Sequence, residues 1–318
     1  MTEPIWKFKD WVPCRKIKAH NKHLCSILSS NSNSIWFLRK NPSLIEWSYL
    51  STNPNAIDLL STNIDKIQWG FLSMNPNAIE LLSQNQDKID WFVLSSNPSA
   101  INLLSQNQDK IYWSGLSGNP SAIDLLSKNI DKIDWSKLSR NPSAINILSQ
   151  HLDKINWVAL SGNPSAIELL LQNQHKIKWY FLSSNPSALS LLTKNQDKID
   201  WPQLSRNPSA IDLLSKNQDK IDWDYLSANS SAIDLLTKNQ DKINWIYLSK
   251  KPAAIDLLMN NKSKINKFSI FNNPNIFEID YIEIKTRMNI YSEELLMHAL
   301  HPSRIQKMIE SGYDIDDL

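Results

Sequence analysis

The sequence predicts an all-α solenoid of tandem 22-residue repeats, each folded as two short helices. Tryptophan recurs every 22 residues, at Trp47, Trp69, Trp91, Trp113, Trp135, Trp157, Trp179, Trp201, Trp223 and Trp245. An N-P-x-A-I-x-L-L segment with helical spacing precedes most of them. Only five glycines occur in 318 residues, which argues against glycine-turned β folds, Rossmann loops and P-loops. A fixed period of this kind is typical of a solenoid.

The copies define a unit whose places can be numbered 1 to 22 from its first asparagine, with residues 119–140 as the type unit. Units begin at 31, 53, 75, 97, 119, 141, 163, 185, 207, 229 and 251, and a truncated copy begins at 273. This periodicity predicts an N-terminal cap with a degenerate repeat at 1–30, the repeat array at 31–272, and a truncated repeat with a helical cap at 273–318.

The first half of the unit predicts a helix that begins at the asparagine of place 1. Asparagine is a good N-cap, and proline at place 2 suits the first helical position, which needs no N–H partner. The apolar residues of places 4, 5 and 8 then lie on one face. Place 4 is alanine from Ala56 through Ala254, and its small side chain lets a neighbouring helix approach closely.

The second half predicts a shorter helix that opens at the tryptophan and can include a 3₁₀ turn. Asp134 and its equivalents at place 16 can cap this helix, whereas Gln68, Tyr112 and Lys178 occupy the same place in other units. A buried tryptophan hides roughly 150–250 Å². We therefore expect the ten periodic tryptophans to form a buried structural spine rather than a ligand-stacking site.

The fixed asparagines of places 1 and 11 and the serine of place 21 mark the corners between helices. Asparagine tolerates tight corners and bonds to nearby backbone. Stacking should place the asparagine amides in ladders that join one repeat to the next, and the serine should serve the same corner. At the ends, Cys25 stands in the tryptophan place, Lys267 replaces the last tryptophan, and 293–300 and 303–311 predict two capping helices.

No catalytic, cofactor or metal site is predicted. His20/His23 and His298/His301 are spaced three apart, but the cysteines, Cys14 and Cys25, lack the paired spacing of a zinc site. The cysteines also have no partnered histidine motif for nucleophilic catalysis. The Asp-Lys pair of places 13 and 14 predicts a row of charges on a solvated ridge. Acid–base chemistry needs carboxylates in unequal environments, and a regular row makes their environments alike.

The variable places 18, 19 and 22 are the candidate binding face, because variable positions on a fixed solenoid scaffold usually line the partner. Aromatic residues gather there in two zones, in units 31–96 and at 179–247. The candidate residues are Tyr49, Phe71, Phe92, Tyr180, Phe181, Tyr225 and Tyr247. Neutral variation with partial burial against the next unit explains the same pattern equally well.

Charge, cysteines and hydropathy limit the partners and the compartment. The net charge of +2 and the absence of a basic stripe disfavour nucleic acid. The N-terminus is basic and the C-terminal tail acidic, so head-to-tail association stays an alternative. No apolar run reaches the ~18 residues that a membrane span needs. The unpaired cysteines and the absence of a secretory segment predict an intracellular protein rather than a secreted one.

The unit Asn53–Ser73, N-P-N-A-I-D-L-L-S-T-N-I-D-K-I-Q-W-G-F-L-S, resembles repeats abundant in proteins of giant nucleocytoplasmic DNA viruses of the mimivirus-like group. The segment H-P-S-R-I-Q-K-M-I-E-S-G-Y-D (His301–Asp314) is similar to the endings of such proteins. The resemblance implies a viral origin and a place in the host cytoplasm or the virion, and it brings no catalytic residues. The short two-helix unit is also similar in geometry to leucine-rich-variant repeats.

These observations favour a non-enzymatic scaffold that binds a protein partner through the variable places beside the tryptophans. A self-assembling structural component of a virus particle is the first alternative, and a nucleic-acid-binding solenoid is the second. The partner's identity and the oligomeric state stay open, because fold predicts function poorly.

Overall fold

The computed structural model describes residues 6–10, 12, 22–279, 282, 285–286, 297, 301, 304 and 306. The chain divides into two compact units, residues 10–276 and residues 1–9 with 277–318. Within the first, the predicted all-α repeat solenoid is confirmed. Cys14, His20 and His298 lie outside the described residues, as does most of the two capping helices predicted at 293–300 and 303–311.

The repeats that begin at 31 through 229 each contain two short α-helices. A 3₁₀ turn precedes all of these helices except those at Ile35–Lys40, Ile79–Ser83 and Trp157–Ser161. In the unit that begins at Asn53, η2 (Pro54–Ala56) leads into α4 (Ile57–Ser61), and η3 (Ile64–Lys66) comes before α5 (Trp69–Leu72). The predicted 3₁₀ turn thus lies ahead of the second helix rather than inside it. The extended backbone of Ile67 at place 15 separates this 3₁₀ turn from the second helix.

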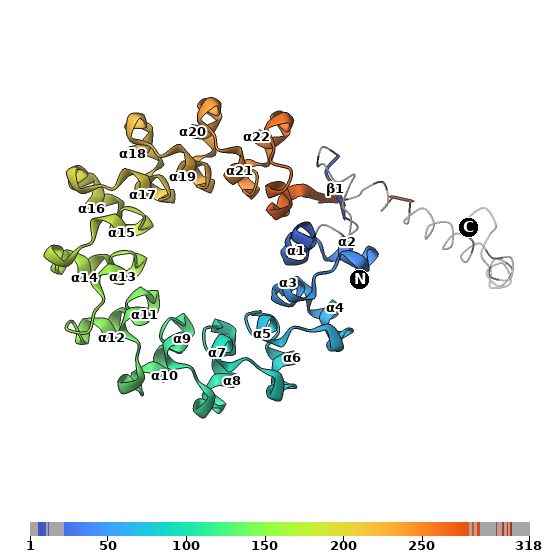
Figure 1. Ribbon diagram of the computed structural model, residues 1–318, viewed down its shortest axis with the longest axis horizontal. Coiled ribbons are helices and arrows are strands. Elements are labelled where there is room, and N and C mark those ends of the chain that lie inside the picture. Colours follow the sequence, from blue (N-terminus) through green and yellow to red (C-terminus); the bar gives the residue numbers. More distant parts are fainter. Residues whose placement is uncertain are drawn as a thin grey trace. The chain divides into compact units, whose positions relative to one another are not determined.

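The α-helices form two sets in residues 10–276 (Figure 1). Helices of the first half of the unit lie on the outer side: α2 (Ile35–Lys40), α4, α6 (Ile79–Ser83), α8 (Ile101–Gln106), α10 (Ile123–Ser127), α12 (Ile145–Gln150), α14 (Ile167–Gln172), α16 (Leu189–Lys194), α18 (Ile211–Ser215), α20 (Ile233–Lys238) and α22 (Ile255–Asn260). Helices that open at the tryptophan lie on the inner side, and α1 continues their row: α1 (Lys22–Ser30), α3 (Trp47–Thr52), α5, α7 (Trp91–Leu94), α9 (Trp113–Ser117), α11 (Trp135–Arg140), α13 (Trp157–Ser161), α15 (Trp179–Ser183), α17 (Trp201–Ser205), α19 (Trp223–Ser227) and α21 (Trp245–Leu248).

The 3₁₀ turns fall into two matching sets. Turns before the outer helices are η2, η5 (Pro98–Ala100), η7 (Pro120–Ala122), η9 (Pro142–Ala144), η10 (Pro164–Ala166), η12 (Pro186–Ala188), η14 (Pro208–Ala210), η16 (Ser230–Ala232) and η18 (Pro252–Ala254). The corresponding turn of the truncated repeat, η21 (Pro274–Ile276), is followed by the strand Phe277–Ile279 instead. Turns before the inner helices are η1 (Pro42–Leu44), η3, η4 (Gln86–Lys88), η6 (Gln108–Lys110), η8 (Ile130–Lys132), η11 (Gln174–Lys176), η13 (Gln196–Lys198), η15 (Gln218–Lys220), η17 (Gln240–Lys242) and η19 (Lys262–Lys264), and η20 (Ser269–Asn272) stands where a further inner helix would end.

The core is a continuous row of small and aliphatic side chains. In the type unit, Ala122 at place 4, Leu126 at place 8 and Leu138 at place 20 are fully buried, and Ile133 at place 15 is nearly so. The same places are buried in the neighbouring units, so each repeat seals its apolar face against the next. Because no helix among the described residues of the array exceeds nine residues, this packing rather than helix propensity stabilises the array.

The asparagine of place 1 joins successive repeats through buried hydrogen bonds, as predicted. The Nδ2 of Asn75 donates to the carbonyl oxygen of Asn53 in the preceding repeat (2.9 Å) and to that of Ser51 at the end of the repeat before it (3.0 Å). Its Oδ1 accepts from the N–H of Asn77 at 3.0 Å and so caps the following turn. Repetition at every unit from Asn53 to Asn229, and again at Asn273, produces a ladder along the array.

The serine of place 21 forms a second link between repeats. The Oγ of Ser51 donates to the carbonyl oxygen of Trp47 (2.7 Å) and accepts from the N–H of Gln68 in the next repeat (3.1 Å). The asparagine of place 11 does not follow this pattern. The Nδ2 of Asn63 donates to the carbonyl oxygen of Leu59 in its own repeat, so the ladder predicted for place 11 is wrong.

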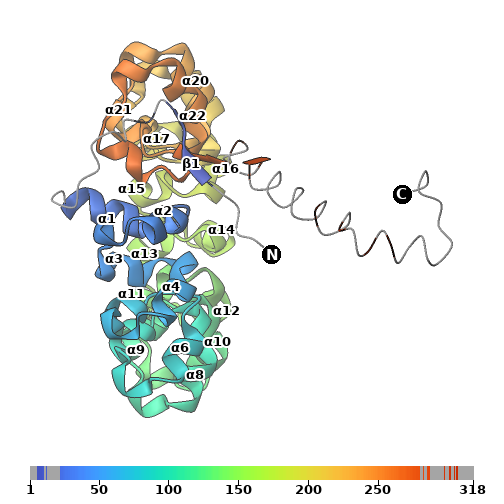
Figure 2. The same ribbon diagram turned by 90° about the vertical axis from the view of Figure 1, so that its right-hand side faces the viewer.

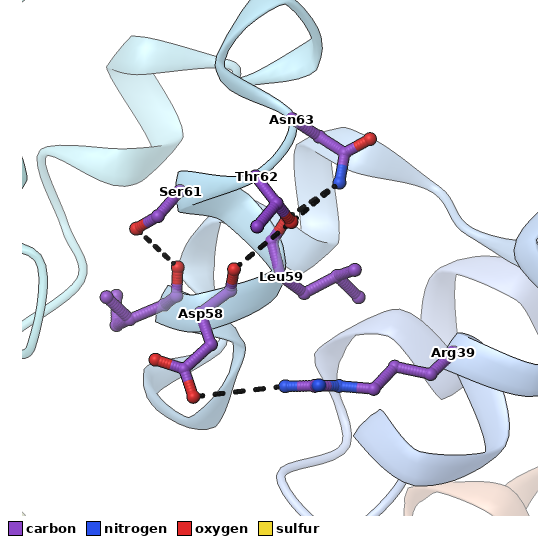
Figure 3. A network of polar contacts seen from close by, with 7 residues as sticks. Arg39, Asp58, Leu59, Ser61, Thr62 and Asn63 are labelled. Atoms are coloured by element: carbon purple, nitrogen blue, oxygen red, sulfur yellow. Dashed lines mark hydrogen bonds and ion pairs between the residues drawn. The ribbon is translucent and has the colours of Figure 1, made fainter.

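The outer helices end in polar contacts of local range (Figure 3). The Oγ of Ser61 donates to the carbonyl oxygen of Ile57, and the Oγ1 of Thr62 donates to that of Asp58. Arg39 of α2 reaches the Asp58 carboxylate of α4 at 3.9 Å, an exposed ion pair between neighbouring repeats. The two hydroxyl groups thus bond back to carbonyl groups in the first turn of α4, and the ion pair adds a contact with the preceding repeat.

The row of repeats closes on itself within residues 10–276. The Nδ2 of Asn31 donates to the carbonyl oxygen of Phe271 (3.1 Å), and the Nδ2 of Asn33 donates to that of Pro274 (3.0 Å). The pairs Asn75–Ser51 and Asn77–Pro54 have the same register inside the array. Figures 1 and 2 show α1 beside the last repeat, and α1 contacts η20. The closing repeat is therefore composite: residues 273–276 supply its beginning and α1 supplies its end.

The other compact unit contains a two-stranded antiparallel ribbon, β1 (Trp6–Phe8) and β2 (Phe277–Ile279). Lys7 pairs with Glu278 in register, and the Lys7 and Lys9 ammonium groups lie 3.4 and 3.5 Å from its carboxylate. The Phe8 and Phe277 rings pack with their centroids 4.7 Å apart. Charged and aromatic cross-strand pairs thus stabilise this short ribbon.

Candidate partner-binding face

The inner helices position the variable places away from the core. In α11, the carboxylate of Asp134 accepts from the N–H groups of Ser136 and Lys137 and starts the helix at Trp135. Places 20 and 21, Leu138 and Ser139, are buried. Since successive residues turn by about 100°, places 18, 19 and 22 project to the opposite side. The caps predicted at place 16 are confirmed at Asp90, Asp134, Asn156, Asp200, Asp222 and Asn244.

Six of the seven candidate binding residues are exposed. Their exposed fractions are 47% for Tyr49, 46% for Phe71, 61% for Phe92, 51% for Tyr180, 37% for Phe181 and 42% for Tyr247. Tyr225 is half-buried. Exposed apolar residues that sequence reasoning left out are Met74, Tyr112, Phe268 and Ile246, although Ile246 had been seen at its variable place. Tyr112 stands at the cap place 16, where the pattern suggested a structural role.

The first aromatic zone contains a pocket of about 500 Å³ on three consecutive inner helices. Phe92 of α7 and Tyr112 beside α9 pack with ring centroids 4.3 Å apart. Gly115, Lys137 and Met74 also line it. Of the candidate residues of the first zone, only Phe92 lines this pocket, beside side chains that the structure brings together with it.

The second aromatic zone is more polar. The guanidinium of Arg206 stacks on the Tyr225 ring with its carbon 3.6 Å from the ring centroid, which accounts for the burial of Tyr225. These two residues and Asp224, Ala228 and Tyr247 line a smaller pocket of about 280 Å³. Nearby in sequence, Tyr180 packs edge-on against Phe181, with centroids 5.0 Å apart.

A hydrogen bond joins the second zone's residues across two repeats. The Nε2 of Gln203 donates to the Tyr180 hydroxyl at 2.9 Å, and Gln203 itself is buried. Tyr180 is therefore held in place while half of its surface stays open to solvent. A rigid, exposed aromatic side chain is the kind of group that anchors interfaces.

The periodic tryptophans are half-buried, so the expectation of a buried tryptophan spine is wrong in its burial. All ten have intermediate exposure, while the fully buried places belong to alanine, leucine and serine. In eight of the ten, all but Trp135 and Trp157, a lysine side chain lies over the ring. The ammonium groups of Lys66, Lys88, Lys110, Lys132, Lys198, Lys220, Lys242 and Lys264 lie 4.5–5.1 Å from the centroids of the tryptophan rings in the preceding repeats.

The lysine of place 14 therefore contacts the tryptophan of the preceding repeat, a role that the sequence analysis missed because it treated this lysine as the partner of the adjacent aspartate. It forms a cation–π contact with the repeat before it, worth about 0.5–1 kcal/mol at an exposed site. Among the described residues, the Asp153–Lys154 pair alone shows an ion pair between places 13 and 14 (3.7 Å). At Trp135 the ring of His151 lies 5.0 Å away. The sequence signal for this contact was the constant spacing between the tryptophan at place 17 of one repeat and the lysine at place 14 of the next.

Electrostatics single out Asp134 beside the first pocket. Burial raises the pKa of its carboxyl, but the hydrogen bonds from the Ser114 hydroxyl and from the Lys137 and Ser136 N–H groups outweigh that effect. Together with the Lys137 charge they hold this pKa below its usual value. The Ser114 Oγ donates to Oδ2 at 2.5 Å, so both carboxylate oxygens are engaged within the protein.

Catalytic and metal chemistry find no constellation in the part of the chain that the structure describes. No three His, Cys, Asp or Glu side chains gather there to hold a metal ion. Cys25 is a buried thiol whose pKa is raised by burial and by the Glu46 charge, which disfavours a nucleophilic thiolate. No helix of the described residues is long and apolar enough to span a bilayer. Comparison with protein-family models, curated proteins and solved structures yields no match.

Proposed function

We propose that the protein is a non-enzymatic scaffold that binds a protein partner through the variable places of its inner helices. The observation that carries this proposal is the contrast within one short helix. Places 20 and 21 are buried and invariant in kind, while places 18 and 19 expose large aromatic side chains that differ from repeat to repeat. Exposed apolar clusters on a rigid frame are typical of partner-binding sites.

The charge of the face supports a protein partner of acidic character. Among places 18, 19 and 22 of the units that begin at 31 through 229, the cations are Lys137, Arg140, Arg206 and Lys250, against the single carboxylate of Asp224. All five side chains are exposed. Charged groups at a rim steer the partner and select it more than they add affinity.

The two alternatives have less support. End-to-end self-assembly needs free stacking surfaces on the first and last repeats, but Asn31 and Asn33 bond to the last repeat of the same chain. Nucleic-acid binding needs a basic stripe, but most place-14 lysines lie over tryptophan rings beside aspartates. Both stay predictions.

Cross-linking and pull-down from the native source test the proposal with the double variant Tyr225→Ala/Tyr247→Ala. Partners captured by the wild-type protein should be lost from the variant. Ile64→Ala is the matched control, because Ile64 is equally exposed but lies at place 12, outside the variable places. Retention of every partner by the double variant would argue strongly against this face.

A viral origin, with the protein in the infected cytoplasm or the virion, is a further proposal that rests on the resemblance of the unit to giant-virus repeats. Quantifying the protein in purified particles and in infected cytoplasm tests it. Absence from both would remove the proposal and leave the binding function untouched.

A further inference from the structure

The pocket on α7, α9 and α11, here called the Gly115 pocket, is lined by Met74, Phe92, Val93, Ser96, Asn97, Pro98, Tyr112, Ser114, Gly115 and Lys137. Its volume of about 500 Å³ lies within the range of small-ligand pockets, ~300–1,000 Å³. It is larger than the pocket of about 280 Å³ beside Tyr225 and Tyr247 on the same face.

Gly115 creates the pocket by leaving out a side chain. Place 19 carries Phe71, Phe181 or Tyr247 in other repeats, whereas Gly115 stands inside α9. Glycine weakens a helix by about 1 kcal/mol relative to alanine, and no left-handed backbone requires it here. A Cβ at this position would lie 2.8 Å from Ser96 Oγ and 3.3 Å from Ser95 Cβ. The glycine thus accommodates the close approach of Ser95 and Ser96 and leaves out the large side chain that other repeats carry at this place.

The walls of the pocket fit a large apolar group. Phe92 and Met74 are 61% and 58% exposed, and Tyr112 is 45% exposed. Such exposure of three neighbouring apolar side chains costs solvation free energy that a bound apolar group would recover. Methionine adds adaptability, since its unbranched thioether adjusts to the shape of what it contacts.

The rim of the pocket favours an anion. Lys137 is the one charged residue of the lining, and Arg140 follows three residues later on the same helix. Neither forms an ion pair with another described residue. The nearest carboxylate, Asp134, is engaged with Ser114 and two backbone N–H groups. The cations are thus available to a ligand while this carboxylate is not.

We propose that the Gly115 pocket receives a large apolar side chain of a partner peptide whose flanking residues are acidic. The apolar side chain packs on Phe92, Tyr112 and Met74, and the flanking carboxylates pair with Lys137 and Arg140. This inference rests on the proposed function and specifies the partner's chemistry at one site.

Fluorescence anisotropy with labelled peptides tests the inference on the full chain. The probe is a short glutamate-rich peptide with a central Trp-Leu pair. One comparison peptide has alanines in place of that pair, and another has lysines in place of the glutamates. We expect saturable binding of the first peptide and at least about tenfold weaker binding of the other two. Equal binding of all three peptides, or binding of a single-stranded oligonucleotide in place of the first, would overturn the inference.

Two substitutions of Gly115 test the place of binding. Gly115→Phe should fill the pocket, and Gly115→Gln copies Gln203, which the protein accommodates beside Ser184 as Gly115 lies beside Ser96. Each should weaken the peptide by about tenfold. Gly162→Gln is the matched control, since Gly162 is exposed and lies outside the pocket. Unchanged affinity in a folded Gly115→Gln protein would overturn the inference.

Charge reversal tests the rim. Lys137→Glu should weaken the acidic peptide about three- to tenfold and reduce its salt dependence. Lys128→Glu, an exposed lysine outside the pocket lining, should leave binding unchanged. The two proposals can fail separately. If the Tyr225→Ala/Tyr247→Ala variant loses partners in the pull-down but the peptide does not bind, the proposed function stands and this pocket is rejected. If the double variant retains its partners in the pull-down, the binding face formed by the variable places is rejected instead.

Discussion

The junctions inside the array and the junction that closes it use the same backbone register with different side chains. Inside, Asn75 bonds to the carbonyl groups of Ser51 and Asn53, Ser51 bridges to Gln68, and Lys66 covers Trp47. At closure, Asn31 and Asn33 keep the register, but the serine place holds Phe271, which has no hydroxyl.

The cation–π contact is also replaced at closure. The tryptophan place of the last repeat holds Lys267, so the ring that a lysine covers inside the array is missing there. The closing junction thus keeps the hydrogen bonds from asparagine to the backbone. It lacks the serine hydrogen bond and the lysine–tryptophan contact that the interior junctions have. We expect the closing junction to be the weakest in the array.

The largest effect should come from the buried leucine of place 20. Leu138→Ala should lower the free energy of unfolding by about 3–5 kcal/mol, because a fully buried leucine leaves a cavity. Leu28→Ala, at the same place in the composite repeat, should cost a similar amount because Leu28 is also fully buried. Urea denaturation measures both. A negligible effect at Leu28 would mean that α1 does not complete the repeat.

Substitution of the place-1 asparagine should destabilise an interior junction more than the closing junction. Asn141→Ala removes Nδ2 bonds to the carbonyl groups of Ser117 and Asn119 and leaves buried acceptors unsatisfied, a loss of about 2–4 kcal/mol. Asn31→Ala should cost less, about 1–2 kcal/mol. Hydrogen exchange should show opening near the substituted repeat in each case. Equal losses at both positions would contradict the ranking of the junctions.

Lysine contacts with tryptophan should contribute less. Lys132→Ala removes the ammonium 4.5 Å from the Trp113 ring and should cost about 0.5–1 kcal/mol. Lys128→Ala is the control, because Lys128 is exposed and its helix lies on the outer side. Chemical denaturation followed by tryptophan fluorescence measures the difference. Identical midpoints for the two variants would show that the stacking does not stabilise the array.

The smallest effect should be an acid dependence at Asp134. Its pKa is depressed in the folded state, so its contribution is complete above the unfolded pKa of about 3.9 and is lost as pH falls through the lower folded value. Asp134→Asn should therefore flatten the fall of the melting temperature with acidification. A wild-type slope in that variant would assign the acid dependence to other carboxyl groups.

Much of the fold followed from the sequence because the copies can be compared with one another. Proline at place 2, the caps at place 16 and the apolar places predicted both helices, and the Asn75–Asn53 contact matches the expected ladder. The burial of the tryptophans was misjudged. Their size suggested core, but the lysine of the next repeat supplies cover without removing the ring from water.

The closure and the pocket could not be predicted, for physical reasons. Whether a solenoid closes depends on the small rotation between repeats, and no single residue encodes that angle. Cys25 and Lys267 marked the ends as irregular, yet the pairing of Asn31 with Phe271 spans 240 residues. Likewise, Gly115 was visible as a variable residue, but Met74 and Tyr112 join it only through the stacking of three helices.

Chemical cross-linking of Lys22 to Lys267 tests closure most directly, since both ammonium groups are exposed and each belongs to one side of the closing junction. A short amine-reactive reagent applied to the full chain, followed by mass spectrometry of the monomer fraction, should recover this link within a single chain. Asn31→Ala should reduce its yield. An open row of repeats would give links between sequence neighbours such as Lys242 and Lys250 while the Lys22–Lys267 link is missing, or found only between two chains, and either result would contradict a closed solenoid.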